Sequence, residues 1–167
     1  NSNPKKAMEF AKGLEKEKSN SVSSVVASLY ADHGTKENHD FFKNAIANTG
    51  GFAKYGLLNQ YSSYLSRLDE KDISDSYKVY ENVIATSNTW WIKMGGYQGL
   101  ISAKNRMTNR ISELNTELNT VSDSMEQAKI EREINDYKSE IDKIDAIYNK
   151  AKAAEKDSKV LDYLKNM

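Results

Sequence analysis

The segment from Leu100 to Met167 contains neither glycine nor proline, and this constrains the fold more than any other feature of the chain. Apolar residues recur through it at alternating steps of three and four residues, in two series separated by one longer step. The first series is Met107, Ile111, Leu114, Leu118, Val121 and Met125, and the second is Ile130, Ile134, Tyr137, Ile141, Ile144, Tyr148 and Ala151. This spacing places a narrow apolar seam along one face of a helix, as in coiled coils and antiparallel bundles. We therefore predict two long amphipathic helices.

The two series lose phase at residues 122–124, where Ser122, Asp123 and Ser124 follow one another. Serine and aspartate side chains accept hydrogen bonds from the free amides of a starting helix, and Ser124 with Gln127 has the spacing of a capping box. The sequence thus predicts an antiparallel hairpin that turns near residues 122–124. Its second arm would have roughly 40 residues and a length of about 60 Å.

The composition excludes several classes of protein. The 24 Lys and Arg residues equal the 24 Asp and Glu residues, so the chain lacks the basic excess of a nucleic-acid binder. Absence of cysteine excludes disulfides, thiolate metal sites and cysteine nucleophiles. No apolar run approaches the roughly 18–20 residues that a membrane span needs. The chain begins at Asn1 without methionine, from which we expect that a leader has been removed or that the sequence is a fragment.

An N-terminal helix is predicted within residues 1–34. Its apolar residues mostly fit one helical stripe, with a polar gap at residues 18–21, and the following run of Ser and Asn has a poor helix propensity. We expect this helix to end near Gly34, because glycine readily takes the left-handed conformation that closes a helix.

Residues 35–97 differ from the rest of the chain in composition, because they hold most of its aromatic residues. Short amphipathic helices are expected after the Gly50-Gly51 pair and again after a polar turn at residues 69–72, and the Gly95-Gly96 pair should kink or interrupt the next helix. No segment alternates like a strand. The predicted fold is therefore all-α. It is an elongated three-helix bundle formed by residues 1–34 and 98–167, into which residues 35–97 insert a small aromatic-rich helical lobe.

The sequence gives no positive reason to expect an enzyme. Both histidines, His33 and His39, fall in one short segment, but their spacing fits no helical pair of metal ligands and no third histidine exists. We interpret them as surface loop residues, and we predict no catalytic, metal or cofactor site. No phosphate-binding glycine motif occurs, and the acidic residues of 69–75 lack the glycine and the final glutamate of a calcium loop.

The candidate binding residues are aromatic. Aromatic side chains beside glycines anchor many protein interfaces, and they also form the cores of small lobes. Neighbouring tryptophans on a helix point about 100° apart, so we favour Trp91 as a core residue and Trp90 as a candidate contact with a partner. The full set of partner-binding candidates is Trp90, Trp91, Tyr97, Phe52 and Tyr55.

The C-terminal pattern resembles the TraC-like minor pilus subunits of type IV secretion systems. That family combines a long N-terminal helix, a small helical lobe and an antiparallel helical hairpin. The residues that carry the resemblance are Arg106, Arg110, Ile111, Leu114, Leu118, Ser122, Asp123, Ile130, Glu133, Ile134, Ile141 and Ile144. The resemblance implies export to the periplasm or to a cell-surface pilus, a role in conjugation, and contacts with pilus proteins or with a recipient cell.

Two functions from different classes follow as hypotheses. The first is a non-catalytic, exported structural or adhesion subunit that contacts other proteins through the aromatic lobe. The alternative is a cytoplasmic coiled-coil adaptor or secretion chaperone that oligomerises through the apolar seam.

Overall fold

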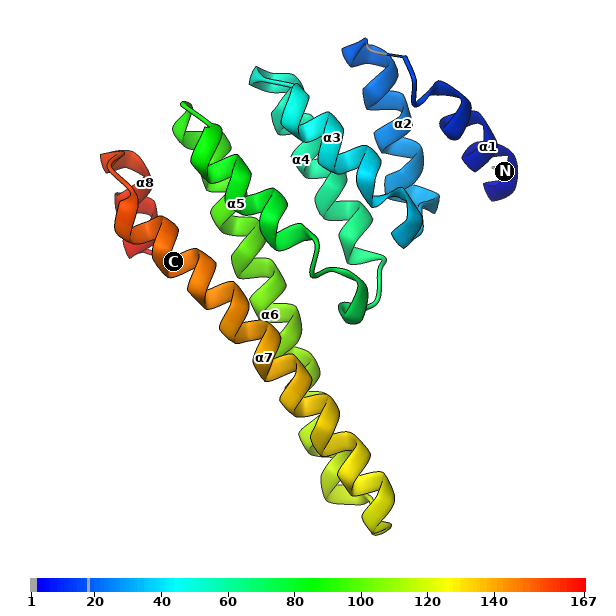
Figure 1. The fold of residues 1–167 in the computed structure, drawn as a ribbon, viewed down its shortest axis with the longest axis vertical. Coiled ribbons are helices and arrows are strands. Elements are labelled where there is room, and N and C mark those ends of the chain that lie inside the picture. Colours follow the sequence, from blue (N-terminus) through cyan, green and yellow to red (C-terminus); the bar gives the residue numbers. More distant parts are fainter. Residues whose placement is uncertain (1–2, 18) are drawn as a thin grey trace. The chain divides into compact units, whose positions relative to one another are not determined.

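The computed structural model describes residues 3–17 and 19–167, and over these ranges every regular element is a helix. The α-helices are α1 (Pro4–Leu14), α2 (Asn20–His33), α3 (His39–Asn48), α4 (Gly51–Ser66), α5 (Ser76–Thr86), α6 (Trp90–Thr120), α7 (Ser124–Ala154) and α8 (Ser158–Lys165). Two short 3-10 helices are η1 (Lys36–Asn38) and η2 (Glu70–Asp72). Figure 1 shows the helices along the chain. The prediction of an all-α chain is confirmed. None of the described helices is long and apolar enough to cross a membrane.

The chain divides into two compact units, residues 1–96 and 97–167. Helix α2 packs on α1 and on α4, and α3 packs on α4 and α5, so the N-terminal helices belong to the same unit as the middle segment. This division differs from the predicted one, which grouped residues 1–34 with residues 98–167. The grouping changed because the apolar side of α2, including Val26 and Tyr30, is buried within the first unit.

The N-terminal segment forms two helices, and the prediction of one helix was wrong. Helix α2 begins at Asn20, where the Ser19 hydroxyl accepts a hydrogen bond from the Val22 amide at 3.2 Å. A polar run of low helix propensity therefore begins a new helix rather than extending the first one. The Tyr30 hydroxyl donates a hydrogen bond to the Glu15 carboxylate, and this bond joins α2 to the end of α1.

Gly34 ends α2 as predicted, but for another reason. Its φ is −67°, outside the left-handed region. A Cβ atom at this position would lie 2.5 Å from the Tyr30 carbonyl oxygen and 3.1 Å from Cε2 of Tyr64. Glycine is required here because the backbone approaches its neighbours too closely for a side chain.

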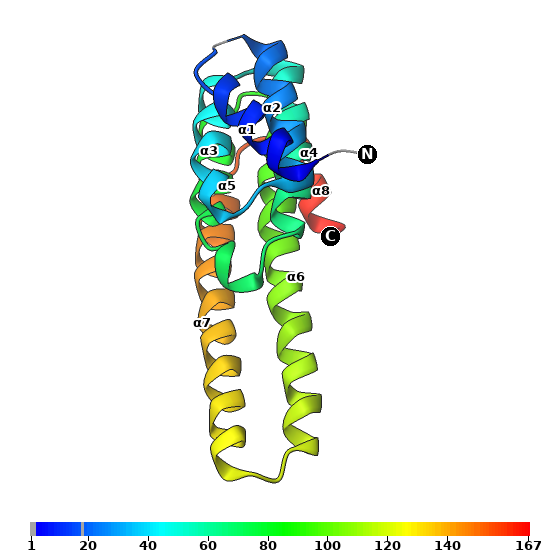
Figure 2. The ribbon, with the colours of Figure 1, turned by 90° about the vertical axis from the view of Figure 1, so that its right-hand side faces the viewer.

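In the second unit, α6 and α7 form the predicted antiparallel hairpin, which both views show (Figures 1 and 2). Residues 121–123 form the turn. Asp123 caps α7, because its Oδ1 accepts from the Met125 amide at 3.4 Å, and Gln127 Nε2 donates to the Val121 carbonyl at 2.8 Å. The predicted capping box of Ser124 with Gln127 was wrong, since the cap lies one residue earlier.

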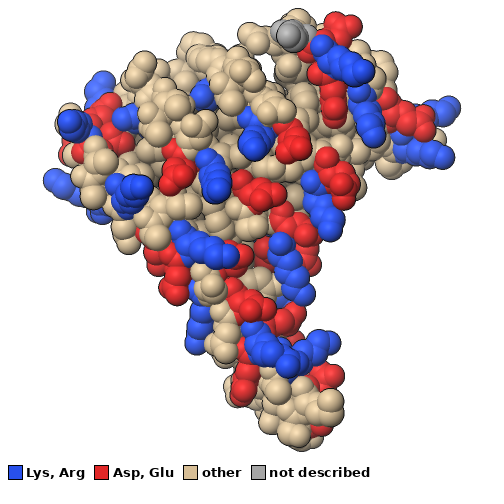
Figure 3. Space-filling model, viewed as in Figure 1, with Lys and Arg blue, Asp and Glu red and all other residues tan. Residues whose placement is uncertain are grey.

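The seam of the hairpin holds the second unit together. Its buried members include Met107, Leu114, Ile130, Ile134 and Ile144. Lys104 Nζ joins the two helices by an ion pair with Asp145 Oδ1 at 2.7 Å. On the face shown in Figure 3, basic and acidic side chains alternate along this hairpin, as is typical of a helical face exposed to solvent.

The second arm is shorter than predicted, because α7 ends at Ala154 and a separate helix, α8, follows. The Glu155 Oε2 atom accepts from the amides of Lys156 and Asp157, both at 3.2 Å, and Asp157 Oδ1 accepts from the Lys159 amide at 2.9 Å. These carboxylates satisfy free amides at the break and start a new helix. Nothing in the seam spacing signals the break.

Candidate functional site: an exposed aromatic cluster

Three of the predicted binding residues, Phe52, Tyr55 and Trp91, meet at the surface of the first unit, and we call them the aromatic cluster. The ring centroids of Phe52 and Trp91 lie 5.2 Å apart in a stacked arrangement with an interplanar angle of 28°. Tyr55 meets Trp91 edge to face, with the centroids 5.5 Å apart at 71°. Pairs of this geometry are worth about 0.5–1.5 kcal/mol beyond their buried area.

The cluster forms because two helix starts present their aromatic residues to each other. Phe52 follows Gly51, whose φ of 61° lies in the left-handed region and allows the chain to turn into α4. Tyr55 is three residues further on and shares the face of Phe52. Trp91 comes from the first turn of α6.

Much of the cluster's surface remains open to solvent. Phe52 is 83% exposed and Tyr55 is 45% exposed, while Trp91 is half-buried. Burying an aromatic side chain is worth about 1.5–3 kcal/mol, so exposed rings that already stack on one another favour contact with a further apolar surface. Trp91, which we favoured as a core residue, is not fully buried: it is half-buried and contacts Phe52 and Tyr55.

The other two candidates are not members of the cluster. Trp90 is half-buried at the start of α6. Tyr97 belongs to the second unit and is completely buried, so its side chain is not available to a partner in this structure. Its hydroxyl donates to Glu155 Oε1 at 2.9 Å, and its ring meets that of Tyr148 at 5.7 Å. Burial and the Glu155 carboxylate raise the pKa of Tyr97. Tyr97 thereby contacts the residue that follows the end of α7.

His39 departs from its prediction as a surface loop residue. It is the first residue of α3 and is half-buried, and its Nε2 lies 2.6 Å from the Tyr61 hydroxyl. Burial lowers the pKa of His39, against the raising effect of Asp75 and Asp40. His33 is the last residue of α2. Among the described residues no group of three or more His, Asp or Glu side chains could hold a metal ion.

The lowered pKa of His39 predicts how stability depends on pH. Above the ordinary value of 6.5, the imidazole is neutral in both states and the full stability is present. As the pH falls below that value, the unfolded chain binds the proton first, and the free energy of unfolding decreases. We expect urea denaturation to show a decrease between about pH 7.5 and pH 5.5. The variant His39→Gln should lose most of this slope, and an unchanged slope would contradict the assignment to His39.

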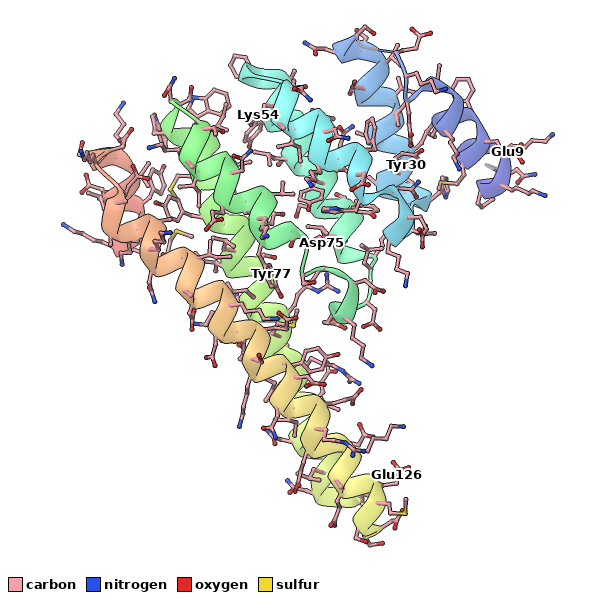
Figure 4. All side chains as sticks on the ribbon, in the orientation of Figure 1. Glu9, Tyr30, Lys54, Asp75, Tyr77 and Glu126 are labelled. Atoms are coloured by element: carbon pink, nitrogen blue, oxygen red, sulfur yellow. The ribbon has the colours of Figure 1, made fainter. Side chains whose placement is uncertain are left out.

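Lys54 is a buried charged side chain of the first unit, and it was not among the binding residues predicted from the sequence. It lies on α4 between Phe52 and Tyr55 in sequence and is only 8% exposed (Figure 4). Burial lowers the pKa of its ammonium group.

A scan against protein-family models and searches of curated proteins and of solved structures found no match to this chain. The candidate site is therefore described by its own chemistry, which is that of a contact surface of three aromatic rings.

Proposed function

We propose that this protein is a non-catalytic structural or adhesion subunit that works by protein–protein contact. The observation that supports the proposal is the exposed aromatic cluster, whose outermost ring, Phe52, is 83% exposed and lies on a second aromatic side chain. Contact anchors of protein interfaces are enriched in aromatic residues that fill pockets on the partner. The stacked rings of Phe52 and Trp91, at the starts of two helices, present an aromatic surface of the kind that such anchors provide.

The proposal places the protein in a type IV secretion or conjugation apparatus, as an exported minor pilus component. Support for this part comes from the resemblance of residues 106–144 to TraC-like subunits. The partners would be other subunits of the pilus or of the secretion apparatus, or a surface protein of a recipient cell.

Photo-crosslinking in cells tests the contact directly. A photoreactive phenylalanine analogue at Phe52 should give one discrete covalent adduct, because this ring would lie within the interface. The matched control carries the same analogue at Phe10, which is 59% exposed on α1 and distant in sequence from the cluster. We expect no adduct from Phe10. Mass spectrometry of the Phe52 adduct should identify a subunit of the secretion apparatus or a surface protein.

Substitutions of the cluster give the second measurement. The double variant Phe52→Ser with Tyr55→Ser removes both ring pairs with Trp91, so we expect its free energy of unfolding to fall by about 1–3 kcal/mol while the chain stays folded. The crosslink from a probe at Asn59, which is exposed on α4 one turn after Tyr55, should nevertheless disappear. If the double variant unfolds, the rings belong to the core and the proposal fails.

Oligomeric state separates this function from that of a coiled-coil adaptor. The seam residues Ile111, Leu118 and Ile141 are half-buried in the hairpin, so a second chain could cover them. Light scattering should find a monomer if the proposed function is right. A tight dimer that Ile141→Asn dissociates would support the adaptor instead.

A further inference from the structure

A groove lies beside the aromatic cluster, between the first turns of α2 and the first turns of α4. It has a volume of about 520 Å³, within the range of roughly 300–1,000 Å³ that small-molecule sites occupy. Both walls belong to the first unit. None of the described residues that line the groove is charged, although 29% of the residues in the chain are. A ligand held by ionic contacts therefore does not fit this groove.

Hydroxyl and amide groups supply the polar part of the lining. They come from Asn20, Ser23 and Ser24 on α2, from Thr49, and from Gln60 on α4. Gln60 Nε2 donates to the Ser24 carbonyl at 3.1 Å, which joins the two walls and fixes the amide in place. Hydroxyls donate and accept hydrogen bonds, and amides present both kinds of group. Such a lining complements a ligand that is itself rich in hydroxyls.

The apolar part of the lining includes the ring of Phe52, which stands at the edge of the groove and stacks on Trp91. The face of an aromatic ring carries partial negative charge and attracts positively polarised C–H groups. Sugar rings present C–H groups on their faces and hydroxyls around their edges. The exposed ring of Phe52 can therefore contact the C–H face of a sugar, while the neutral groups beside it bond to the sugar's hydroxyls.

Gly56 keeps the space above the α4 backbone open. A Cβ atom at this position would meet no atom within 4 Å, and the backbone does not need a left-handed conformation there. Glycine within a helix is about 1 kcal/mol less favourable than alanine, so neither packing nor backbone geometry accounts for it. The missing side chain leaves room for a ligand to approach α4 closely at this point.

We propose that the groove between α2 and α4 binds a neutral saccharide, with one sugar ring stacked on Phe52 and its hydroxyls bonded to the groove's side chains. A peptide fits less well. The described part of the groove has no strand edge with free backbone groups, and an amphipathic helix would need more apolar anchors than Phe52, Ala53 and Leu57 supply. The sugar would use the same exposed ring, Phe52, as the protein contact proposed above, but the Gly56 variant described below changes only the groove, so the two proposals can fail separately.

Titration of the full chain with soluble sugars tests the proposal, with amide NMR spectra as the readout. The probes are maltotriose, cellotriose and chitotriose, which are neutral, and trigalacturonate, which is acidic. We expect at least one neutral trisaccharide, at concentrations up to about 10 mM, to shift the amide signals of the first turns of α2 and α4. Trigalacturonate should bind at least about tenfold more weakly, because the described lining of the groove offers it no cation.

Gly56→Gln and Gly13→Gln are the matched variants. Both glycines lie within helices with nothing within 4 Å of a Cβ atom, but Gly13 lies on α1, away from the groove lining. Glutamine has a better helix propensity than glycine, so both variants should fold at least as stably as the parent chain. Gly56→Gln should weaken saccharide binding about tenfold or more, while Gly13→Gln should leave it unchanged.

Three results would overturn the proposal. One is that no neutral sugar shifts the groove signals at the highest concentration. Another is that trigalacturonate or an uncharged peptide of serine and leucine binds there more tightly than every neutral sugar. The third is that Gly56→Gln binds the sugar as well as Gly13→Gln does.

Discussion

Replacing Gly96 by valine is expected to lower the free energy of unfolding by about 3 kcal/mol. A Cβ atom at Gly96 would lie 2.7 Å from Cγ1 of Ile84 and 2.9 Å from the carbonyl oxygen of Tyr80, both on α5. A backbone carbonyl within a helix cannot move aside without shifting the helix, so α5 and α6 would have to separate. Urea denaturation followed by circular dichroism would measure the loss.

The neighbouring glycine gives the control. At Gly95 a Cβ atom would meet only Cδ1 of Leu58, at 3.2 Å, and this is the flexible end of a side chain. Gly95→Val should therefore lower the free energy of unfolding by less than about 1 kcal/mol. Both variants change the helix propensity equally, so the difference between them reports the close packing at Gly96. Equal losses at the two positions would show that close packing is not the reason for Gly96.

Truncation of Tyr61 to alanine is the second large effect, with an expected loss of about 4 kcal/mol. Tyr61 is completely buried at the centre of the first unit. Its ring contacts those of Phe42 at 5.4 Å, Tyr64 at 6.3 Å and Tyr80 at 5.6 Å, which come from three helices. Removal of the ring would leave a cavity that α3, α4 and α5 all border, and thermal or urea denaturation would report its cost.

The variant Tyr61→Phe separates the ring from its hydroxyl. It keeps the packing but removes the partner of His39 Nε2, so we expect a loss of about 1–2 kcal/mol. Burial raises the pKa of Tyr61, with Tyr80 and Asp75 adding to the effect, and the hydroxyl therefore stays protonated near neutral pH. A loss as large as that of Tyr61→Ala would show that the hydrogen bond, and not the packing, dominates.

The aromatic residues show how far sequence reasoning reached toward the site. The concentration of rings between residues 35 and 97 was visible in the sequence, and three of five selected residues meet at the surface. Composition could not separate Tyr97, which the second unit buries, from Phe52, which is exposed. Aromatic residues serve both as core and as interface, so only the positions of neighbouring helices decide between these roles.

The surroundings of two charged side chains, the buried Lys54 and the half-buried Glu155, were the other feature that the sequence did not reveal. Lys54 and Glu155 have the residue types of surface positions. Tertiary packing covers Lys54, and it brings Tyr97 from α6 to the carboxylate at the end of α7.

The sequence by itself determined the helical hairpin and its turn, because the seam repeats every three to four residues and loses phase beside Asp123. Such periodicity is local, and the physics of a single helix is enough to interpret it. The tertiary structure decided the rest: that α2 joins the first unit, that Gly95 and Gly96 lie inside an unbroken α6, and that the second arm ends at Ala154. These outcomes depend on close approaches between residues far apart in the chain, such as Gly96 with Tyr80 and Tyr97 with Glu155, which no short stretch of sequence records.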